Sequence, residues 1–272
     1  YLAAWLHDCG KVATPPHVVD KGTKLETIFD RIELIKTRME LLKKDAEIAF
    51  LKRQLNGRTP KDFDQEYLDT IKNINSDMEF LEQCNIGGEF MKPDDQERVK
   101  DIGSKKIEFN GSKQNFLSAN EIQNLNIPKG TLLPEEREII NDHIVITIEM
   151  LEQLPYPKNL KNIPEFAGGH HEKMDGTGYP KGLSEHQMST QAKIMAIADI
   201  YEALTAADRP YKEGKKLSQA MRIMGFMKND YHIDEELFEI FVRSGVYKKY
   251  AKDYVNIDQI DNVDEAAVLG VK

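Results

Sequence analysis

Four histidines and two aspartates are spaced along this 272-residue sequence in a way that suits metal binding. They are His7 with Asp8, His143, His170 with His171, and Asp199. Imidazole nitrogen and carboxylate oxygen together suit transition-metal ions, and a carboxylate can bridge two of them. Because six ligands exceed the needs of one structural zinc ion, the set predicts a two-metal site with Asp8 as the bridge.

A two-metal site predicts hydrolysis of a phosphoester. Two ions clamp a phosphate and lower the pKa of a water molecule between them, so that hydroxide attacks phosphorus in line. Lys11, three residues after Asp8, is placed to face that phosphate. Each group alone also fits a structural role, such as a capped helix end at Asp8 or a core histidine at His143. The metal-site prediction therefore depends on the combination.

Two loops near these residues could form a ligand site. The first follows the paired histidines and reads Gly-Thr-Gly-Tyr-Pro at 176–180, where glycine lets the backbone approach a ligand closely. The second, at 208–212, carries Arg209, Tyr211 and Lys212. Two cations and an aromatic ring suit a phosphate and a stacked base.

Helices are expected to position most of the candidate ligands. Pro134 followed by two acids opens a helix that runs to Pro155 and carries His143 on its apolar face. A short helix over 163–172 should carry His170 and His171 at its C-terminal end. An amphipathic helix over 190–206 should carry Asp199 beside its apolar side.

Residues 24–84 show no chemistry but a strong helical pattern. Apolar residues recur from Leu25 through Ile28 to Ala49 at steps of three and four, which predicts one long helix. A second seam runs from Tyr67 to Leu81, after a breaker at 56–60. The two segments predict an antiparallel helical hairpin or a partner-binding arm.

Two shorter signals follow this pair of seams. Asn110-Gly111 between short apolar runs predicts a small β-hairpin. Ser118 and Glu121 have capping-box spacing, which predicts a short helix that ends before Pro128.

Composition narrows the classes of partner. No run approaches the roughly 20 apolar residues of a membrane span, and the net charge of −9 weighs against DNA or RNA polymers. A small phosphorylated ligand needs only a few local cations.

Cys9 and Cys84 lie far apart, which argues against a disulfide framework and fits a reducing cytosol. Because the sequence begins without Met, we interpret it as a domain of a longer protein.

Residues 1–20 and about 118–230 resemble the HD-GYP family of bacterial cyclic di-GMP phosphodiesterases. The matching motifs are His-Asp-x-Gly-Lys at 7–11, His143, His-His-Glu-x-x-Asp-Gly-x-Gly-Tyr-Pro at 170–180, Ile-Ala-Asp-Ile-Tyr-Glu-Ala-Leu-Thr at 197–205 and Arg-Pro-Tyr-Lys at 209–212. They stand in the family's order and spacing and are highly specific. Residues 24–117 depart from the family pattern, which has a short connection there. Glu202 stands where many members carry Asp.

The resemblance implies an all-α HD-superfamily bundle. Its core would comprise residues 1–23 and 118–250, with a helical insertion at 24–117 and a C-terminal tail at 251–272. It implies hydrolysis of cyclic di-GMP to linear pGpG or GMP, by the cytoplasmic output domain of a longer signalling protein. The alternatives are the same reaction on 3′,3′-cyclic GMP-AMP, and a binding module with little activity. The insertion would mediate dimerisation or bind a regulator.

The resemblance also assigns roles to residues. His7, Asp8 and Asp199 would hold one metal ion, and Asp8, His143, His170 and His171 the second. Iron and manganese are the family's metals, with two or three ions. Lys11 would contact the scissile phosphate, and the ligand cradle would comprise Asp175, Gly178, Tyr179, Pro180, Arg209, Tyr211 and Lys212. Members take a further His from an upstream helix, so the first metal site is expected to be incomplete in a sequence that starts six residues before His7.

Overall fold

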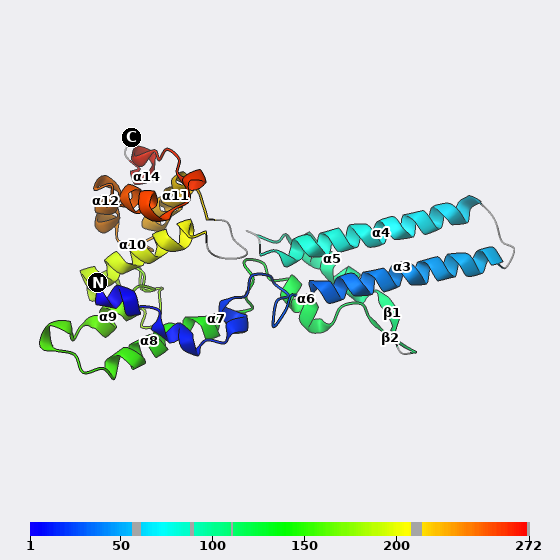
Figure 1. The fold of residues 1–272 in the computed structure, drawn as a ribbon, viewed down its shortest axis with the longest axis horizontal. Helices are drawn as coiled ribbons and strands as arrows, with labels where there is room; N and C mark the ends of the chain where they lie inside the picture. The colour runs from blue at the N-terminus through cyan, green and yellow to red at the C-terminus, as the bar shows by residue number, and fades with distance from the viewer. Residues whose placement is uncertain (56–60, 88–89, 110, 208–213, 271–272) are drawn as a thin grey trace. The chain divides into compact units, whose positions relative to one another are not determined.

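The computed structural model describes residues 1–55, 61–87, 90–109, 111–207 and 214–270 (Figure 1). The chain divides into two compact units. The first unit comprises residues 1–15 and 138–272, and the second comprises residues 16–137. These boundaries differ from those inferred from the sequence because residues 16–23 and 118–137 pack with the helical hairpin. Leu125, for example, lies in the same core as Leu25 and Ile35.

The first unit is built from helices, in agreement with the expected all-α class. Its elements are α1 (Leu2–Leu6), η1 (Cys9–Ala13), α8 (His143–Glu152), η2 (Lys158–Leu160), α9 (Ile163–Gly168), η3 (Glu185–Gln187), α10 (Thr190–Thr205), α11 (Leu217–Asn229), α12 (Glu235–Arg243), α13 (Val246–Tyr254), η4 (Ile257–Gln259) and α14 (Glu265–Leu269). Helix α7 (Pro134–Asn141) crosses the boundary between the units. None of the helices that the structure describes is long and apolar enough to cross a membrane.

The largest core of the first unit lies between α10 and the four helices that follow it. Tyr201 of α10 is buried there and donates a hydrogen bond to the Tyr247 carbonyl at 2.9 Å. Leu269 of α14 is buried in the same core, and Lys228 donates to its carbonyl at 3.2 Å. The described part of the expected tail, residues 251–270, therefore contributes to the core that supports α10.

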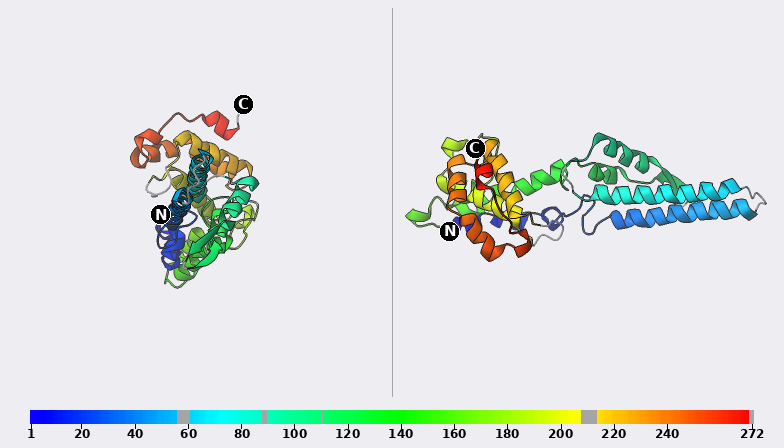
Figure 2. Two further views of the ribbon diagram at one scale, coloured as in Figure 1. Left: turned by 90° about the vertical axis from the view of Figure 1, so that its right-hand side faces the viewer. Right: turned by 90° about the horizontal axis from the view of Figure 1, so that it is seen from above.

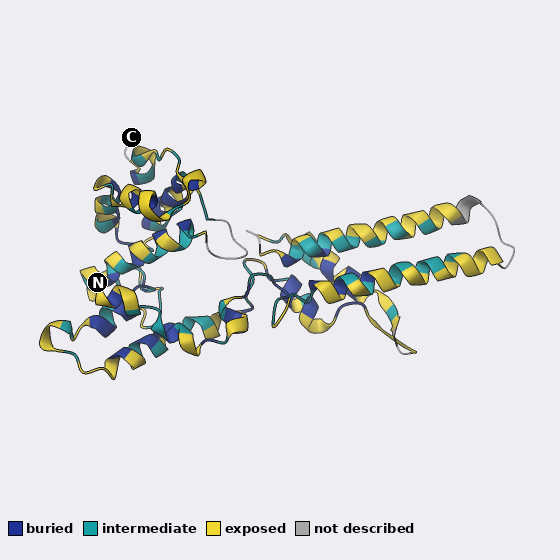
Figure 3. Ribbon diagram, viewed as in Figure 1, coloured by how far each residue is buried: buried dark blue, intermediate teal, exposed yellow. Residues whose placement is uncertain are grey.

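The second unit is a helical hairpin with a smaller cap. Its elements are α2 (Pro16–Val19), α3 (Ile32–Leu55), α4 (Lys61–Asn85), α5 (Pro93–Ser104), β1 (Lys106–Phe109), β2 (Ser112–Asn115) and α6 (Ala119–Leu125). Helices α3 and α4 run side by side in every view (Figures 1 and 2). Buried residues gather where α5 and α6 pack, whereas much of the hairpin is exposed (Figure 3). The predicted helical hairpin is confirmed.

The shorter signals in the second unit are also confirmed. β1 and β2 pair antiparallel, with Lys106 opposite Asn115 and Phe109 opposite Ser112. Phe116 follows the second strand directly and is buried in the core. Ser118 and Glu121 form the predicted capping box at the start of α6.

The first helix of the hairpin begins later than the apolar pattern predicted. It starts at Ile32 rather than Leu25, and Ile28 is 97% exposed. Side chains hold the preceding segment in a non-helical form. The Glu26 carboxylate accepts hydrogen bonds from the Gly22 and Thr23 amides, and the Asp30 carboxylate accepts one from the Ile32 amide. Acid side chains thus compete with the helix for backbone donors.

The helix predicted over 134–155 is two helices, α7 and α8, separated at Asp142. The break follows from the His143 ring, whose Nδ1 donates a hydrogen bond to the Ile140 carbonyl. In a continuous helix that carbonyl would accept from the amide of residue 144. The separation places His143 at the first turn of α8, buried to 3% exposure.

A buried ion pair closes the second unit, and its loss should destabilise the chain. The Lys21 side chain is 1% exposed and donates to Asn124 and to both oxygens of Glu136 at 2.7–2.9 Å. Glu136→Gln leaves a buried ammonium without its counter-charge, so we expect a loss of about 3–5 kcal/mol in urea unfolding. The exposed neighbour provides the control, and Glu135→Gln should change stability by less than ~0.5 kcal/mol. Equal effects of the two variants would contradict this account.

Candidate metal centre

The His7-Asp8 pair reaches the site because η1 packs tightly on α8. The Gly10 amide donates a hydrogen bond to Thr147 Oγ1 at 2.9 Å. A Cβ atom at Gly10 would lie 2.0 Å from the His143 carbonyl oxygen, so only glycine permits this approach. The contact brings Asp8 beside His143, although the two are far apart in the sequence.

The paired histidines lie in a turn rather than at the end of a helix. Helix α9 ends at Gly168, four residues earlier than the sequence predicted, with Gly169 at its C-cap. His170 and His171 follow directly, and His170 is 3% exposed. The turn frees the two rings from helical geometry, in which adjacent side chains point about 100° apart. Both rings can therefore face one centre, and their centroids are 4.2 Å apart.

Three of the histidines are held in the same tautomer by the same local bond. His7 Nδ1 donates to the Ala4 carbonyl at 2.8 Å, His170 Nδ1 donates to Ala167 at 2.5 Å, and His143 Nδ1 donates to Ile140. A carbonyl oxygen only accepts, so the proton lies on Nδ1 in each ring. Each neutral ring is left with a lone pair on Nε2, which is the arrangement found for metal-binding histidines.

These lone pairs converge on the carboxylate of Asp8. Its Oδ1 lies 3.1 Å from His143 Nε2 and 4.0 Å from His170 Nε2, and its Oδ2 lies 3.4 Å from His7 Nε2. The other predicted carboxylate, Asp199 of α10, lies 3.5 Å from His7 Nε2 through its Oδ1. The structure thus brings three of the predicted histidines around Asp8, with Asp199 beside His7.

Two overlapping groups can hold a metal ion among the described residues. His143, His170 and His171 form one, and His7, Asp8 and His170 form the other. In each group the ligand atoms lie within 4.8 Å of one another. His170 belongs to both groups, whereas the resemblance placed it in only one of two sets that share Asp8.

The ligand atoms suit a bound cation, because without one they are unpaired acceptors that lie close together. Asp8 Oδ1, His143 Nε2 and His170 Nε2 are buried and have no hydrogen-bond partner. All three are acceptors that face one another, and a buried unsatisfied polar atom costs about 1–3 kcal/mol. A bound metal cation would satisfy all of them at once. The residues present therefore fit the metal ions that the sequence predicted.

Burial and charge set the protonation state that metal binding needs. Burial lowers the pKa of His170, and burial together with the His170 charge lowers that of His171 to about 3. Burial raises the pKa of Asp8 and Asp199, but neighbouring groups outweigh it and hold both below the usual range. For Asp8 these groups are His143, Lys11 and His7, and for Asp199 they are His7, His170 and His171. Both carboxylates are therefore ionised and both histidines neutral near pH 7.

His7 differs from the other rings. Its pKa is raised, chiefly by Asp199 and against the effect of burial. The ring lies between two carboxylates, Asp8 and Asp199. A cation bound between these carboxylates would oppose that rise by displacing the proton.

The loop after the histidines is fixed by an acid to which the sequence assigned no role. The Glu172 carboxylate is buried and accepts hydrogen bonds from the Lys181 and Leu183 amides at 2.7 and 2.8 Å. A Cβ at Gly178 would lie 2.4 Å from the Lys173 nitrogen, so glycine is required there. The glutamate directly after the two histidines was the sequence signal for this role, because a buried glutamate needs hydrogen-bond partners.

Three predicted ligand-site residues take up defined places around this loop. Tyr179, joined to Pro180 by a cis peptide bond, stacks on the His171 ring with centroids 4.8 Å apart. Asp175 accepts hydrogen bonds from the Thr177 amide and hydroxyl, which shapes the turn. Lys11 donates to Asp8 Oδ2 at 2.6 Å. Arg209, Tyr211 and Lys212 lie outside the described residues.

Comparison with known proteins agrees with these motifs. Residues 119–237 match the model of the HD domain family. A cyclic di-GMP phosphodiesterase of Thermotoga maritima is 28% identical over 244 residues, which is 83% of this chain and 64% of that protein. The HD pair at 7–8 and the Gly-Tyr-Pro at 178–180 complete the pattern. The family match, this relative and the motifs support the resemblance to the HD-GYP family.

Two further relatives match over shorter stretches of this chain. A 3′3′-cGAMP-specific phosphodiesterase of Vibrio cholerae is 41% identical over 80 residues, which is 29% of this chain and 18% of that protein. A cyclic di-GMP phosphodiesterase of Pseudomonas aeruginosa is 44% identical over 79 residues, with the same two coverages. The matches to these three relatives cover less than two thirds of each relative's length.

Loss of His170 should remove more metal than loss of an exposed histidine. Because His170 belongs to both ligand groups, we expect His170→Ala to lower metal affinity by well over the roughly tenfold that loss of a supporting hydrogen bond costs. Elemental analysis after dialysis against limiting metal measures this. The exposed His186 is the control, and His186→Ala should keep its metal. Equal metal content in the two variants would exclude the assignment.

Close packing at Gly10 should matter for metal binding and not only for stability. Gly10→Ala forces η1 away from α8 and moves Asp8 from the histidines. Gly245→Ala is the control, because Gly245 has a positive φ of 68° but no atom near its Cβ position. We expect both variants to lose about 1–3 kcal/mol of stability. Only Gly10→Ala should lose metal, and retention of full metal content would contradict the packing argument.

Proposed function

We propose that this chain is a metal-dependent phosphodiesterase that hydrolyses cyclic di-GMP to linear pGpG or GMP. The observation that carries the proposal is the convergence of three histidine lone pairs on Asp8, where the lone pairs of His143 and His170 are buried. The relatives from Thermotoga maritima and Pseudomonas aeruginosa, both described as cyclic di-GMP phosphodiesterases, support the choice of substrate.

The proposed ligand assignment follows the two groups. His7, Asp8 and Asp199 would hold one ion, and Asp8, His143, His170 and His171 the other, with His170 also close enough to serve the first. We propose iron or manganese, because mixed imidazole and carboxylate ligands suit both. When bound, two such ions would polarise the phosphate and supply a nucleophilic water.

The chain's own residues would orient the substrate. Lys11 is half-exposed, and its ammonium holds Asp8 with Oδ1 toward His143 while leaving N–H groups to neutralise a phosphate. Tyr179 would limit the approach of water to His171 by covering its ring. We assign the rest of the cradle to Gly178, Pro180, Arg209, Tyr211 and Lys212, and give Asp175 the task of shaping the loop.

A second substrate has a specific observation in its favour. The Vibrio cholerae relative is described as specific for 3′3′-cGAMP, and its identity to this chain is similar to that of the Pseudomonas aeruginosa relative. The two substrates differ in one base, which the metal ligands do not contact. Parallel assays of the manganese-loaded and iron-loaded chain with both dinucleotides separate them. Faster turnover of cyclic GMP-AMP would favour this alternative.

The test of catalysis uses Asp8 and Lys11. We expect Asp8→Asn to abolish product formation, since an amide is a weak metal ligand, and Lys11→Met to lower kcat by about 100-fold with metal retained. Chromatography of pGpG and GMP measures both. Lys158→Met, at an exposed lysine in η2, is the matched control and should be fully active. Product formation by Asp8→Asn at the wild-type rate would refute the proposed function.

A further inference from the structure

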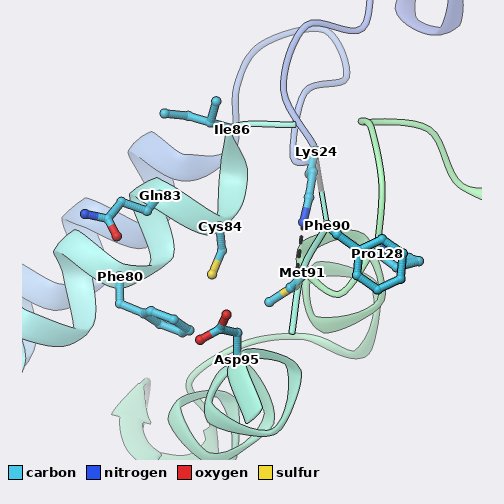
Figure 4. Close-up of a pocket in the computed structure, with 9 residues that line it drawn as sticks. All are labelled: Lys24, Phe80, Gln83, Cys84, Ile86, Phe90, Met91, Asp95 and Pro128. Carbon is cyan, nitrogen blue, oxygen red and sulfur yellow. Dashed lines mark hydrogen bonds between the residues drawn. The ribbon is translucent and has the colours of Figure 1, made fainter. Parts of the chain in front are cut away.

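The second unit contains a pocket that plays no part in the metal centre. It has a volume of about 250 Å³ and lies between the start of the unit, the end of α4 and the start of α5 (Figure 4). Its lining residues are Lys24, Phe80, Gln83, Cys84, Ile86, Phe90, Met91, Asp95 and Pro128. The volume is below the ~300–1,000 Å³ of pockets for drug-sized ligands, so it suits a small metabolite.

One wall of the pocket carries a buried ammonium group without a counter-charge. Lys24 is 4% exposed, and its Nζ donates to the Leu125 carbonyl at 2.9 Å and to Met91 Sδ at 3.7 Å. Both acceptors are neutral, and Lys24 forms no ion pair with a carboxylate of the described residues. Lysine is rarely buried without an anionic partner, and an ammonium has three donors. One donor therefore remains for an anion in the pocket.

The opposite wall carries a carboxylate that has no partner either. Asp95 makes no side-chain hydrogen bond or ion pair with the described residues, and it is half-buried. In Figure 4 its carboxylate and the Lys24 amine point toward the same space from opposite sides. The two groups are too far apart to pair with each other. Asp95 would repel a purely anionic ligand, and Lys24 would repel a purely cationic ligand.

Two residues near the pocket, Arg98 and Cys84, do not alter its pair of opposite charges. Arg98 stacks over the Phe80 ring at 4.1 Å and pairs with Asp77 at 3.4 Å, so its charge is engaged outside. Burial raises the pKa of the Cys84 thiol to about 11. Cys84 is therefore a neutral thiol, which argues against a metal site, since the thiolate is the form that binds metal.

We propose that this pocket binds a free apolar α-amino acid, with its carboxylate on Lys24, its ammonium on Asp95 and its side chain against Phe80, Met91 and Pro128. Each charged group of such a ligand meets the opposite charge, and the apolar walls take up the side chain. This ligand would bind to the second unit whether or not the metal centre is active. The pocket would then give the chain an amino-acid input that is separate from its proposed phosphodiesterase activity.

Binding to the full chain tests the proposal with leucine, methionine and phenylalanine as probes. Isothermal titration should detect at least one of them with a Kd below about 1 mM. The matched analogues of phenylalanine are 3-phenylpropanoate, which lacks the ammonium, and 2-phenylethylamine, which lacks the carboxylate. For the amino acid that binds, the analogue without the ammonium and the analogue without the carboxylate should each bind at least about tenfold more weakly. Absence of binding by all three amino acids would refute the proposal.

Variants locate the binding and distinguish it from other sites. Lys24→Met and Asp95→Asn should each weaken binding at least about tenfold. The exposed neighbours Lys92→Met and Asp94→Asn are the matched controls and should bind as the wild type does. If Lys24→Met fails to fold by circular dichroism, Asp95→Asn and the analogues still decide the outcome. Undiminished binding by Asp95→Asn, or equal binding of 3-phenylpropanoate, would overturn the assignment of a zwitterionic ligand.

Discussion

The site depends on one electrostatic conflict, in which lone pairs of several histidines face the carboxylate of Asp8 in a buried place. Each ring is locked by a hydrogen bond from Nδ1 to the carbonyl three residues earlier, so none can relieve the conflict by moving its proton. Asp8 Oδ1 and two of the nitrogens are buried and have no hydrogen-bond partner among the described residues. A cation bound between them would satisfy all three, and the fold of the first unit brings them together.

Two helices, α7 and α9, end just before candidate metal ligands. Helix α7 stops where His143 takes the carbonyl of Ile140, and α9 stops at Gly168 just before the paired histidines. Close packing then brings the pieces together, because η1 can approach α8 only through Gly10. The long α10, supported by its own apolar core, brings Asp199 to the remaining side of His7.

The second unit shows how differently two buried lysines can be used. Lys21 is neutralised by Glu136 and by Asn124, and its role is to hold the unit closed. Lys24, three residues later, donates only to neutral acceptors among the described residues, at the wall of a pocket. Burying a charge without a partner costs stability, which is why we propose a ligand for Lys24.

Sequence alone indicated the residue types of the candidate metal centre, the resemblance to the HD-GYP family and most of the helices. The ligands could be found because histidine and aspartate occur in specific motifs, and the hairpin, the β-turn and the capping box because their signals span a few residues. Tertiary structure alone decided what those residues do together. Ile28 continues the apolar pattern yet lies exposed, because the side chains of Glu26 and Asp30 take up the nearby backbone donors. His170 serves both ligand groups, and Glu172 holds the loop, because contacts between distant segments fix where a side chain points. The hydrogen bond from Gly10 to Thr147 spans 137 positions, and no local pattern can encode a contact of that length.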